Sequence, residues 1–116
     1  LRSTRKAGRM KHERVVSISP DHPALSGHFP GHPVVPGVVI LDEVIETLRR
    51  QSGEAMVMTG LPTVKLLSPL LPGERLTIEL ESEGADTAVF TCRVDHRLVA
   101  AGSICFHLPA VRTSRP

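Results

Sequence analysis

The sequence predicts an α+β fold in which a curved antiparallel sheet wraps around one long central helix. The first observation is a strongly apolar helical segment from about residue 36 to residue 52. The second is a set of later segments in which apolar and polar residues alternate, which is typical of half-buried strands. The third is the pair of turn signals that separates them, Pro72-Gly73 and Gly84-Ala85-Asp86. Together these features indicate one helix followed by a meander.

Length and composition suit one small soluble domain. The chain has 116 residues, of which 41% are apolar and 22% are charged, as in ordinary globular proteins. A domain of this size buries a limited fraction of its surface, so we expect an oligomer. The net charge of +2, the absence of Trp and Tyr and the presence of only three Phe argue against nucleic-acid binding.

Membrane and disulfide-rich secreted proteins are also disfavoured. No stretch approaches the roughly 20 apolar residues that span a bilayer, and the N-terminus lacks the apolar core of a secretory signal. Cys92 and Cys105 are the only cysteines, too few for a disulfide framework. If Asp95 and His96 form a hairpin turn, Cys92 faces about residue 99 or 100 instead of Cys105. We therefore expect reduced thiols and a cytoplasmic protein.

The first expected element is a short strand over residues 14–19. Residues 1–13 should form a flexible basic leader, since six Lys or Arg crowd the first fourteen residues against one acid. Such a leader is either a solvated tail or an electrostatic landing site for an acidic partner such as a carrier protein. From Pro20 to Gly37 follows a loop rich in Pro, Gly and His, and long ordered loops are usually functional.

The helix follows, from about Pro36 to Ser52, with Gly53 as its C-terminal stop. Pro is tolerated at the first position of a helix because its missing N–H has no intrahelical partner. The first two turns are apolar on nearly every side, which predicts a buried helix. Glu46 and Arg50 are spaced to form an ion pair on its exposed side.

The remaining segments predict strands. The first is a long β segment over residues 55–67, bent or bulged at Gly60-Leu61-Pro62. The meander that follows has three strands, expected over residues 76–81, 88–94 and 98–108. The domain therefore spans residues 14–108, and residues 109–116 are expected to form a flexible tail.

The junction between the loop and the helix carries a specific pattern of residues. It consists of His28-Phe29, Pro33, Pro36-Gly37-Val38 and Asp42. This pattern resembles the active-site segment of the hot-dog-fold 3-hydroxyacyl-(acyl-carrier-protein) dehydratases. The expected order of strand, loop, central helix and meander is similar to that family over residues 14–108. The resemblance therefore implies the hot-dog fold.

The resemblance also implies roles for individual residues. His28 corresponds to the catalytic histidine of the family and Asp42 to its catalytic acid, while Gly37 corresponds to the glycine whose N–H polarises the thioester carbonyl. One branch of the family has Glu at the acid position, and a longer branch has Asp. This chain has the length of the Glu branch and the acid of the Asp branch, so the resemblance leaves the preferred acyl length open. The same motif supplies the other residues assigned to substrate binding, Phe29, Pro36 and Val38.

For the whole protein, the resemblance implies a homodimer, or a higher oligomer, in which the His of one chain meets the acid of the other. The implied reaction converts 3-hydroxyacyl thioesters, carried on the phosphopantetheine of an acyl carrier protein, to trans-2-enoyl thioesters in fatty-acid or related lipid biosynthesis. The family uses no metal, and no cofactor is required because the thioester itself acidifies C2. An acyl tunnel is expected along the buried helix.

The chemistry independently favours these residue types. Dehydration needs a base that removes a weakly acidic proton from C2 and an acid that protonates the departing 3-hydroxyl. A neutral His, with an ordinary pKa of about 6.5, suits the first task. The charge that develops on the thioester oxygen needs fixed donors, which a helix N-terminus supplies. Gly at that point lets a substrate approach the backbone closely.

Helix geometry separates Asp42 from its neighbour Glu43. At about 100° per residue, Glu43 falls on the face that holds Glu46 and Arg50, whereas Asp42 lies at the edge of the apolar face. We therefore expect Asp42 to be shielded, which favours the protonated form that a general acid requires. Glu43 is expected to stay ionised in water.

Other polar residues support weaker interpretations. His22, His28 and His32 invite a zinc site, but their spacing fits no standard ligand set and no Cys lies nearby. Lys65 and Arg75 could line the entrance for a phosphopantetheine phosphate, although solvated charges at strand ends are commoner.

Two other classes of function remain open. An acyl thioesterase on the same fold uses a carboxylate to activate water and typically lacks the His-Phe…Pro-Pro-Gly pattern. A non-catalytic acyl-binding module needs neither His28 nor Asp42. Turnover of hydroxyacyl and saturated acyl thioesters separates the three hypotheses.

Overall fold

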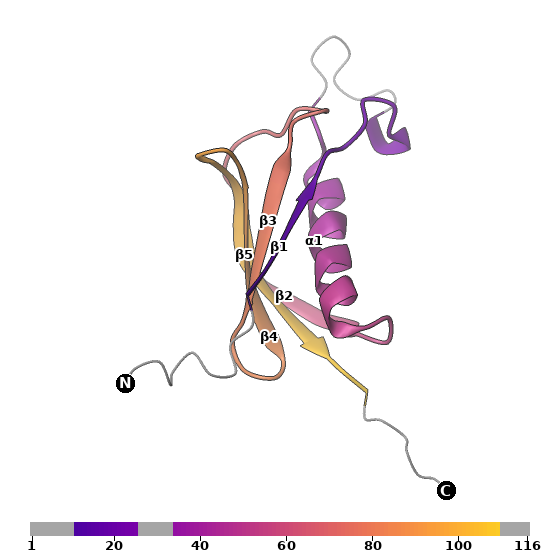
Figure 1. Ribbon diagram of the computed structural model, residues 1–116, viewed down its shortest axis with the longest axis vertical. Helices are drawn as coiled ribbons and strands as arrows, with labels where there is room; N and C mark the ends of the chain where they lie inside the picture. The colour runs from indigo at the N-terminus through magenta and orange to yellow at the C-terminus, as the bar shows by residue number, and fades with distance from the viewer. Residues whose placement is uncertain (1–10, 26–33, 110–116) are drawn as a thin grey trace, which may run out of the picture.

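The computed structural model describes residues 11–25 and 34–109, which form one α-helix, five strands and a short 3-10 turn. The helix α1 spans Gly37–Ser52 and the turn η2 spans Pro23–Leu25. The strands are β1 (Lys11–Val16), β2 (Val57–Leu66), β3 (Leu76–Ser82), β4 (Thr87–Val94) and β5 (Arg97–His107). Neighbouring strands are antiparallel, in the order β1-β3-β4-β5-β2. Figure 1 shows α1 lying along one face of this twisted sheet.

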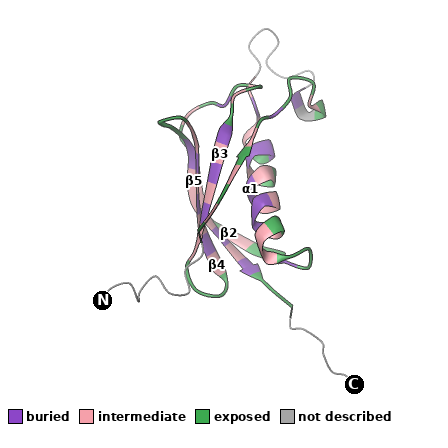
Figure 2. Cartoon of the chain, in the orientation of Figure 1, coloured by how far each residue is buried: buried purple, intermediate pink, exposed green. Residues whose placement is uncertain are grey.

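The core lies between α1 and the sheet (Figure 2). Burying one large aliphatic or aromatic side chain stabilises the fold by about 1.5–3 kcal/mol, so this layer holds the two elements together. From α1 the buried apolar residues are Val39, Ile40, Val44 and Leu48, and from the sheet they include Leu76, Ile78, Leu80, Phe90, Val99 and Ile104. The predicted class, α+β with a curved antiparallel sheet around a central helix, is confirmed.

The predicted meander is confirmed, with strand ends that differ by at most one residue. In β3, the side chains of Leu76, Ile78 and Leu80 are buried and the residues between them are half-exposed. This alternation places one face of the sheet against α1 and the other toward solvent. Asp95, at φ 53°, lies in the two-residue turn between β4 and β5, where Asp tolerates a left-handed backbone better than most residues.

Cys92 is fully buried in β4 and pairs with Ala100 of β5, as the sequence predicted. Burial raises the pKa of the Cys92 thiol to about 12. The thiol therefore stays protonated at neutral pH, and Cys92 is a small core residue instead of a nucleophile. Cys105, which is half-buried, is also a free thiol.

The helix α1 begins and ends where its sequence signals lie. Pro36 is its N-cap, and Gly53 follows its end at φ 112°, a conformation that side-chain-bearing residues rarely adopt. The Gly53 N–H donates to the Arg49 carbonyl at 2.7 Å. The predicted pair is confirmed, since Arg50 Nε lies 3.1 Å from Glu46 Oε2. Within the described residues, no helix has the length and apolar character that a bilayer crossing requires.

The strand β1 begins three residues before the predicted strand, at Lys11, and ends at Val16 instead of Ser19. Its pairing explains the difference, because Lys11 lies opposite Glu81 of β3. Charged side chains are common on edge strands, where they discourage pairing with another chain. In the sequence alone, charged residues such as Lys11 and Glu13 are equally typical of a solvated leader, so the start of β1 is predicted as part of the leader. The predicted end of the basic leader therefore falls inside a strand.

The strand β2 forms the other edge of the sheet and is irregular, as predicted. Its register against β5 shifts between Met58 and Gly60 and again between Gly60 and Thr63, which confirms the bulge at residues 60–62. An exposed apolar edge strand is a surface on which another chain can pair. The exposed apolar residues of β2 are Val57, Met58, Val64 and Leu66.

The variant Gly102→Ala is expected to destabilise the protein strongly. A Cβ on Gly102 would overlap the carbonyl oxygen of Thr63 in β2 and the ring of Phe90 in β4. Because a backbone oxygen can yield only if β2 moves away from β5, we expect a loss at or above the ~1–3 kcal/mol typical of overpacking. Urea unfolding measures this loss. Gly60→Ala is the matched control, since a Cβ there meets nothing within 4 Å, and equal stabilities of the two variants would contradict the close approach.

Candidate active site

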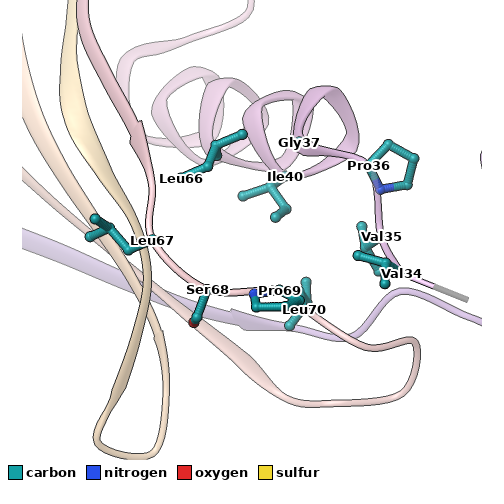
Figure 3. Close-up of a pocket in the computed structure, with 10 residues that line it drawn as sticks. All are labelled: Val34, Val35, Pro36, Gly37, Ile40, Leu66, Leu67, Ser68, Pro69 and Leu70. Atoms are coloured by element: carbon teal, nitrogen blue, oxygen red, sulfur yellow. The ribbon is translucent and has the colours of Figure 1, made fainter. Parts of the chain in front are cut away.

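A pocket opens beside the N-terminal end of α1 (Figure 3). Its volume is about 380 Å³, within the range of small-molecule sites. One wall is the segment that leads into the helix, and the other is the segment that follows β2. The lining residues are Val34, Val35, Pro36, Gly37, Ile40, Leu66, Leu67, Ser68, Pro69 and Leu70. Apart from the Ser68 hydroxyl, every lining side chain is apolar.

Hydrogen bonds hold the two walls in place. The Val35 N–H donates to the Leu70 carbonyl at 2.8 Å, which joins one wall directly to the other. On the sheet side, the Leu67 N–H donates to the Val99 carbonyl at 2.8 Å. The Ser68 hydroxyl donates to the Leu98 carbonyl of β5, also at 2.8 Å. The pocket is therefore attached to the sheet on one side and to the start of the helix on the other.

An ion pair supports the same wall from outside. The Arg97 guanidinium donates to the two carboxylate oxygens of Glu74 at 2.7 and 3.2 Å and to the Pro69 carbonyl at 3.2 Å. The Leu71 N–H also donates to Glu74, at 2.9 Å. Arg97 first, and then the Leu71 N–H, lower the pKa of Glu74 below its ordinary value. The pair is therefore fully charged at neutral pH.

Pro36 and Gly37 place the start of the helix at the pocket. The Pro36 carbonyl accepts hydrogen bonds from the N–H groups of Val39 at 3.0 Å and Ile40 at 3.4 Å, and Pro36 offers no side-chain cap. The first N–H groups of a helix have no intrahelical acceptor and lie at the positive end of its dipole. Amide donors in apolar surroundings can stabilise an oxyanion as it forms.

Asp42 and Val38 lie outside this pocket. Asp42 is exposed, and so is Val38, at 63%, one turn earlier on the same side of α1. The expectation that Asp42 is shielded is therefore wrong for the single chain. The physical reason is that the sheet covers only one side of α1, so that even an apolar residue of the first turn can face outward. The roles assigned to Asp42 and Val38 stay predictions.

Glu43, expected to be solvated, is instead half-buried and paired. Arg14 of β1 lies 3.2 Å from its carboxylate and donates to the hydroxyl of the buried Thr47 at 3.0 Å. The Thr47 hydroxyl in turn donates to the Glu43 carbonyl at 2.7 Å. This contact exists because β1 passes beside α1, which the sequence alone does not show. Of the two adjacent acids, Glu43 is held in a structural ion pair and Asp42 faces outward.

His28 and Phe29 lie outside the described residues, and so does His32, so their predicted roles rest on the sequence. Across residues 11–25 and 34–109, no three His, Cys, Asp or Glu side chains gather closely enough to hold a metal ion. The zinc interpretation also needs His28 and His32, so it is not tested. Lys65 and Arg75 are both exposed.

Sequence reasoning missed the second wall of the pocket, residues 66–70. The sequence pattern there predicts only the end of a strand and the approach to a turn. A signal is nevertheless present, since residues 66–71 read LLSPLL and a solvated turn does not need four leucines. Such an apolar connection is expected to line a pocket or an interface.

Comparison with known sequences places the chain among dehydratases. The family model described as ApeI dehydratase matches residues 4–103. The 3-hydroxyacyl-[acyl-carrier-protein] dehydratase FabZ of Roseiflexus castenholzii is 31% identical over 113 residues, a match that covers 86% of this chain and 76% of that protein.

Solved structures support the fold. The dehydratase heterocomplex ApeI:P from Xenorhabdus doucetiae matches with a TM-score of 0.74 at 23% identity, over 84% of this chain and 92% of the other. The fluoroacetyl-CoA thioesterase FlK matches with a TM-score of 0.65 at 13% identity, over 84% and 85%. At these identities the likeness confirms the predicted hot-dog fold alone, which dehydratases and thioesterases share. The sequence match across most of the chain distinguishes the two classes, and the chain belongs to the ApeI-like dehydratase family.

Proposed function

We propose that this hydro-lyase removes water from 3-hydroxyacyl groups held as thioesters on an acyl carrier protein and releases trans-2-enoyl thioesters. The observation that carries the proposal is the identity of about 30% to 3-hydroxyacyl-[acyl-carrier-protein] dehydratases over most of the chain. The apolar pocket at the helix N-terminus agrees with it, because an acyl thioester needs both an apolar cavity and amide donors at its carbonyl.

In the proposed reaction, the Gly37 N–H donates to the thioester oxygen while His28 takes a proton from C2. The C2–H electrons form the C2–C3 double bond, and the C3–O bond breaks as Asp42 donates a proton to the departing hydroxyl. Water and the enoyl thioester are the products, and no electron acceptor is required. Phe29, Pro36 and Val38 are proposed to contact the substrate around these atoms.

The partner is proposed to be a second chain of the same fold, in the simplest case a second copy. Asp42 and Val38 face outward in one chain, so a general acid at Asp42 needs another surface to shield it from water. The sheet has two edges. Along β1 the charged Lys11 and Glu13 are exposed beside Val15, whereas β2 exposes four large apolar residues beside Lys65. We therefore place the pairing edge at β2. The solved relative ApeI:P is itself a dehydratase heterocomplex.

The carrier protein and the cellular location are further parts of the proposal. The exposed side chains of Lys65 and Arg75 could attract the phosphate of a phosphopantetheine arm. The free thiols of Cys92 and Cys105 are in line with the reducing cytoplasm.

The proposal is tested by turnover of two sets of thioesters with the purified protein. One set carries 3-hydroxyacyl groups of graded length on an acyl carrier protein, and the other carries saturated acyl groups of the same lengths. We expect an enoyl product, seen by its ultraviolet absorbance, from the first set and no free thiol from the second. Release of free thiol from both sets would support a thioesterase, and saturable binding without any product would support a non-catalytic acyl-binding module.

A further inference from the structure

Leu66, the last residue of β2, lies with its side chain against the first residue of α1 (Figure 3). A Cβ added to Gly37 would lie 2.6 Å from Leu66 Cδ1 and 3.7 Å from its Cγ. The space that a larger residue at position 37 would need is therefore occupied by this leucine. Gly37 permits the contact, and Leu66 covers the start of the helix at the pocket.

The backbone of Leu66 is fixed, but its side chain is not enclosed. Leu66 pairs with Ala100 of β5, and the next N–H, from Leu67, donates to the Val99 carbonyl at 2.8 Å. The residue is nevertheless 57% exposed. A side chain with a held backbone and an open outer side changes position by moving between rotamers, without any change in the strand.

The lining of the pocket indicates which part of the substrate Leu66 meets. Gly37, Ile40 and Leu66 converge on one region, and the lining residues carry no charged side chain. A polar phosphopantetheine arm would lose hydrogen bonds to water there, whereas an acyl chain would lose none. The carbons next to the reacting carbonyl are therefore the part of the substrate that fits this region best.

We propose that Leu66 is a specificity-determining residue that limits the bulk of the acyl group beside the reacting carbons. This inference rests on the proposed dehydration of 3-hydroxyacyl thioesters. The Leu66 side chain covers Gly37 and changes rotamer to admit the carbonyl, so that its size sets the room left for a branch near C3. Straight chains pass this point, and chains branched at C4 are rejected.

The test compares straight 3-hydroxyacyl thioesters with 4-methyl-branched ones of equal carbon number, as the ratio of their kcat/KM values. We expect Leu66→Ala to raise the branched-to-straight ratio by about tenfold, the lower end of what one methyl-sized group achieves in an apolar pocket. Leu66→Phe should lower the same ratio. Leu71→Ala is the matched control, because Leu71 is similarly exposed, at 49%, and does not line the pocket. A ratio that is unchanged in both Leu66 variants, with wild-type turnover intact, would overturn the inference.

A second measurement tests the contact without relying on activity. The free energies of unfolding of Gly37→Ala, Leu66→Ala and the double variant form a cycle. We expect Gly37→Ala to destabilise the protein less when Leu66 has already been shortened, and additive effects would overturn the contact. If the wild-type protein forms no enoyl product at all, the proposed function itself is wrong and the substrate role of Leu66 falls with it. Wild-type turnover combined with an unchanged ratio removes only the role of Leu66.

Discussion

The Asp42→Asn variant is expected to lose dehydratase activity, with kcat falling by about 10²–10⁴-fold, the range that general acid–base catalysis contributes. An amide cannot donate the proton that the departing 3-hydroxyl requires, although it has nearly the same size and shape as the carboxyl group. Because Asp42 is exposed in the single chain and an amide of the same size can still form hydrogen bonds at a chain interface, the substitution should leave the free energy of unfolding almost unchanged. Steady-state formation of the enoyl thioester, together with urea unfolding, measures both effects.

The control for this prediction is Glu43→Gln. Glu43 is the next residue and has the same carboxyl group, but its carboxylate is paired with Arg14. Its replacement should reduce stability by less than about 1 kcal/mol, as for other partly exposed ion pairs, and should keep most of the activity. If Asp42→Asn stayed active while Glu43→Gln did not, the assignment of the acid would have to be exchanged between the two residues.

The fold was predictable where its signals are local. The start of α1 at Pro36-Gly37, its end at Gly53 and the alternation of Leu76, Ile78 and Leu80 each depend on a few neighbouring residues. The structure has these elements within one or two residues of the predicted positions. The bulge in β2 also follows from the local Gly60-Leu61-Pro62 sequence.

The features of the fold and of the site that could not be predicted depend on contacts between segments that are distant in the sequence. Lys11 belongs to a strand because β3 lies beside it, and Glu43 is half-buried because Arg14 reaches it across 29 residues. Helix periodicity predicted a shielded Asp42 and a solvated Glu43, and both predictions are wrong for the single chain. Periodicity could not show which side of α1 the sheet and β1 cover. The contact of Leu66 with Gly37 could not be predicted either, since no sequence pattern links the end of a strand to the start of an earlier helix.

A mixture of the variants His28→Ala and Asp42→Ala is expected to regain activity that neither variant has alone. If the His of one chain works with the acid of the other, a heterodimer of the two variants contains one site with both groups intact and one site with neither. Random exchange makes about half of the dimers heterodimers, so about a quarter of the wild-type sites are restored. The measurement is enoyl-thioester formation after the two variants have been unfolded together and refolded.

Two controls establish whether the regained activity comes from sites shared between chains. Mixing the two folded variants without exchange of subunits should restore nothing, and a His28→Ala/Asp42→Ala double variant refolded with either single variant should also stay inactive. Within one chain, Asp42 lies five residues from Gly37, about 7.5 Å further along the helix axis, and faces outward. If Gly37, Asp42 and a histidine of one chain acted on the same substrate, that substrate would have to span this separation. Full activity of one single variant would show that the replaced group does not act in catalysis. No recovery in a mixture of well-folded heterodimers would show that both groups act within one chain.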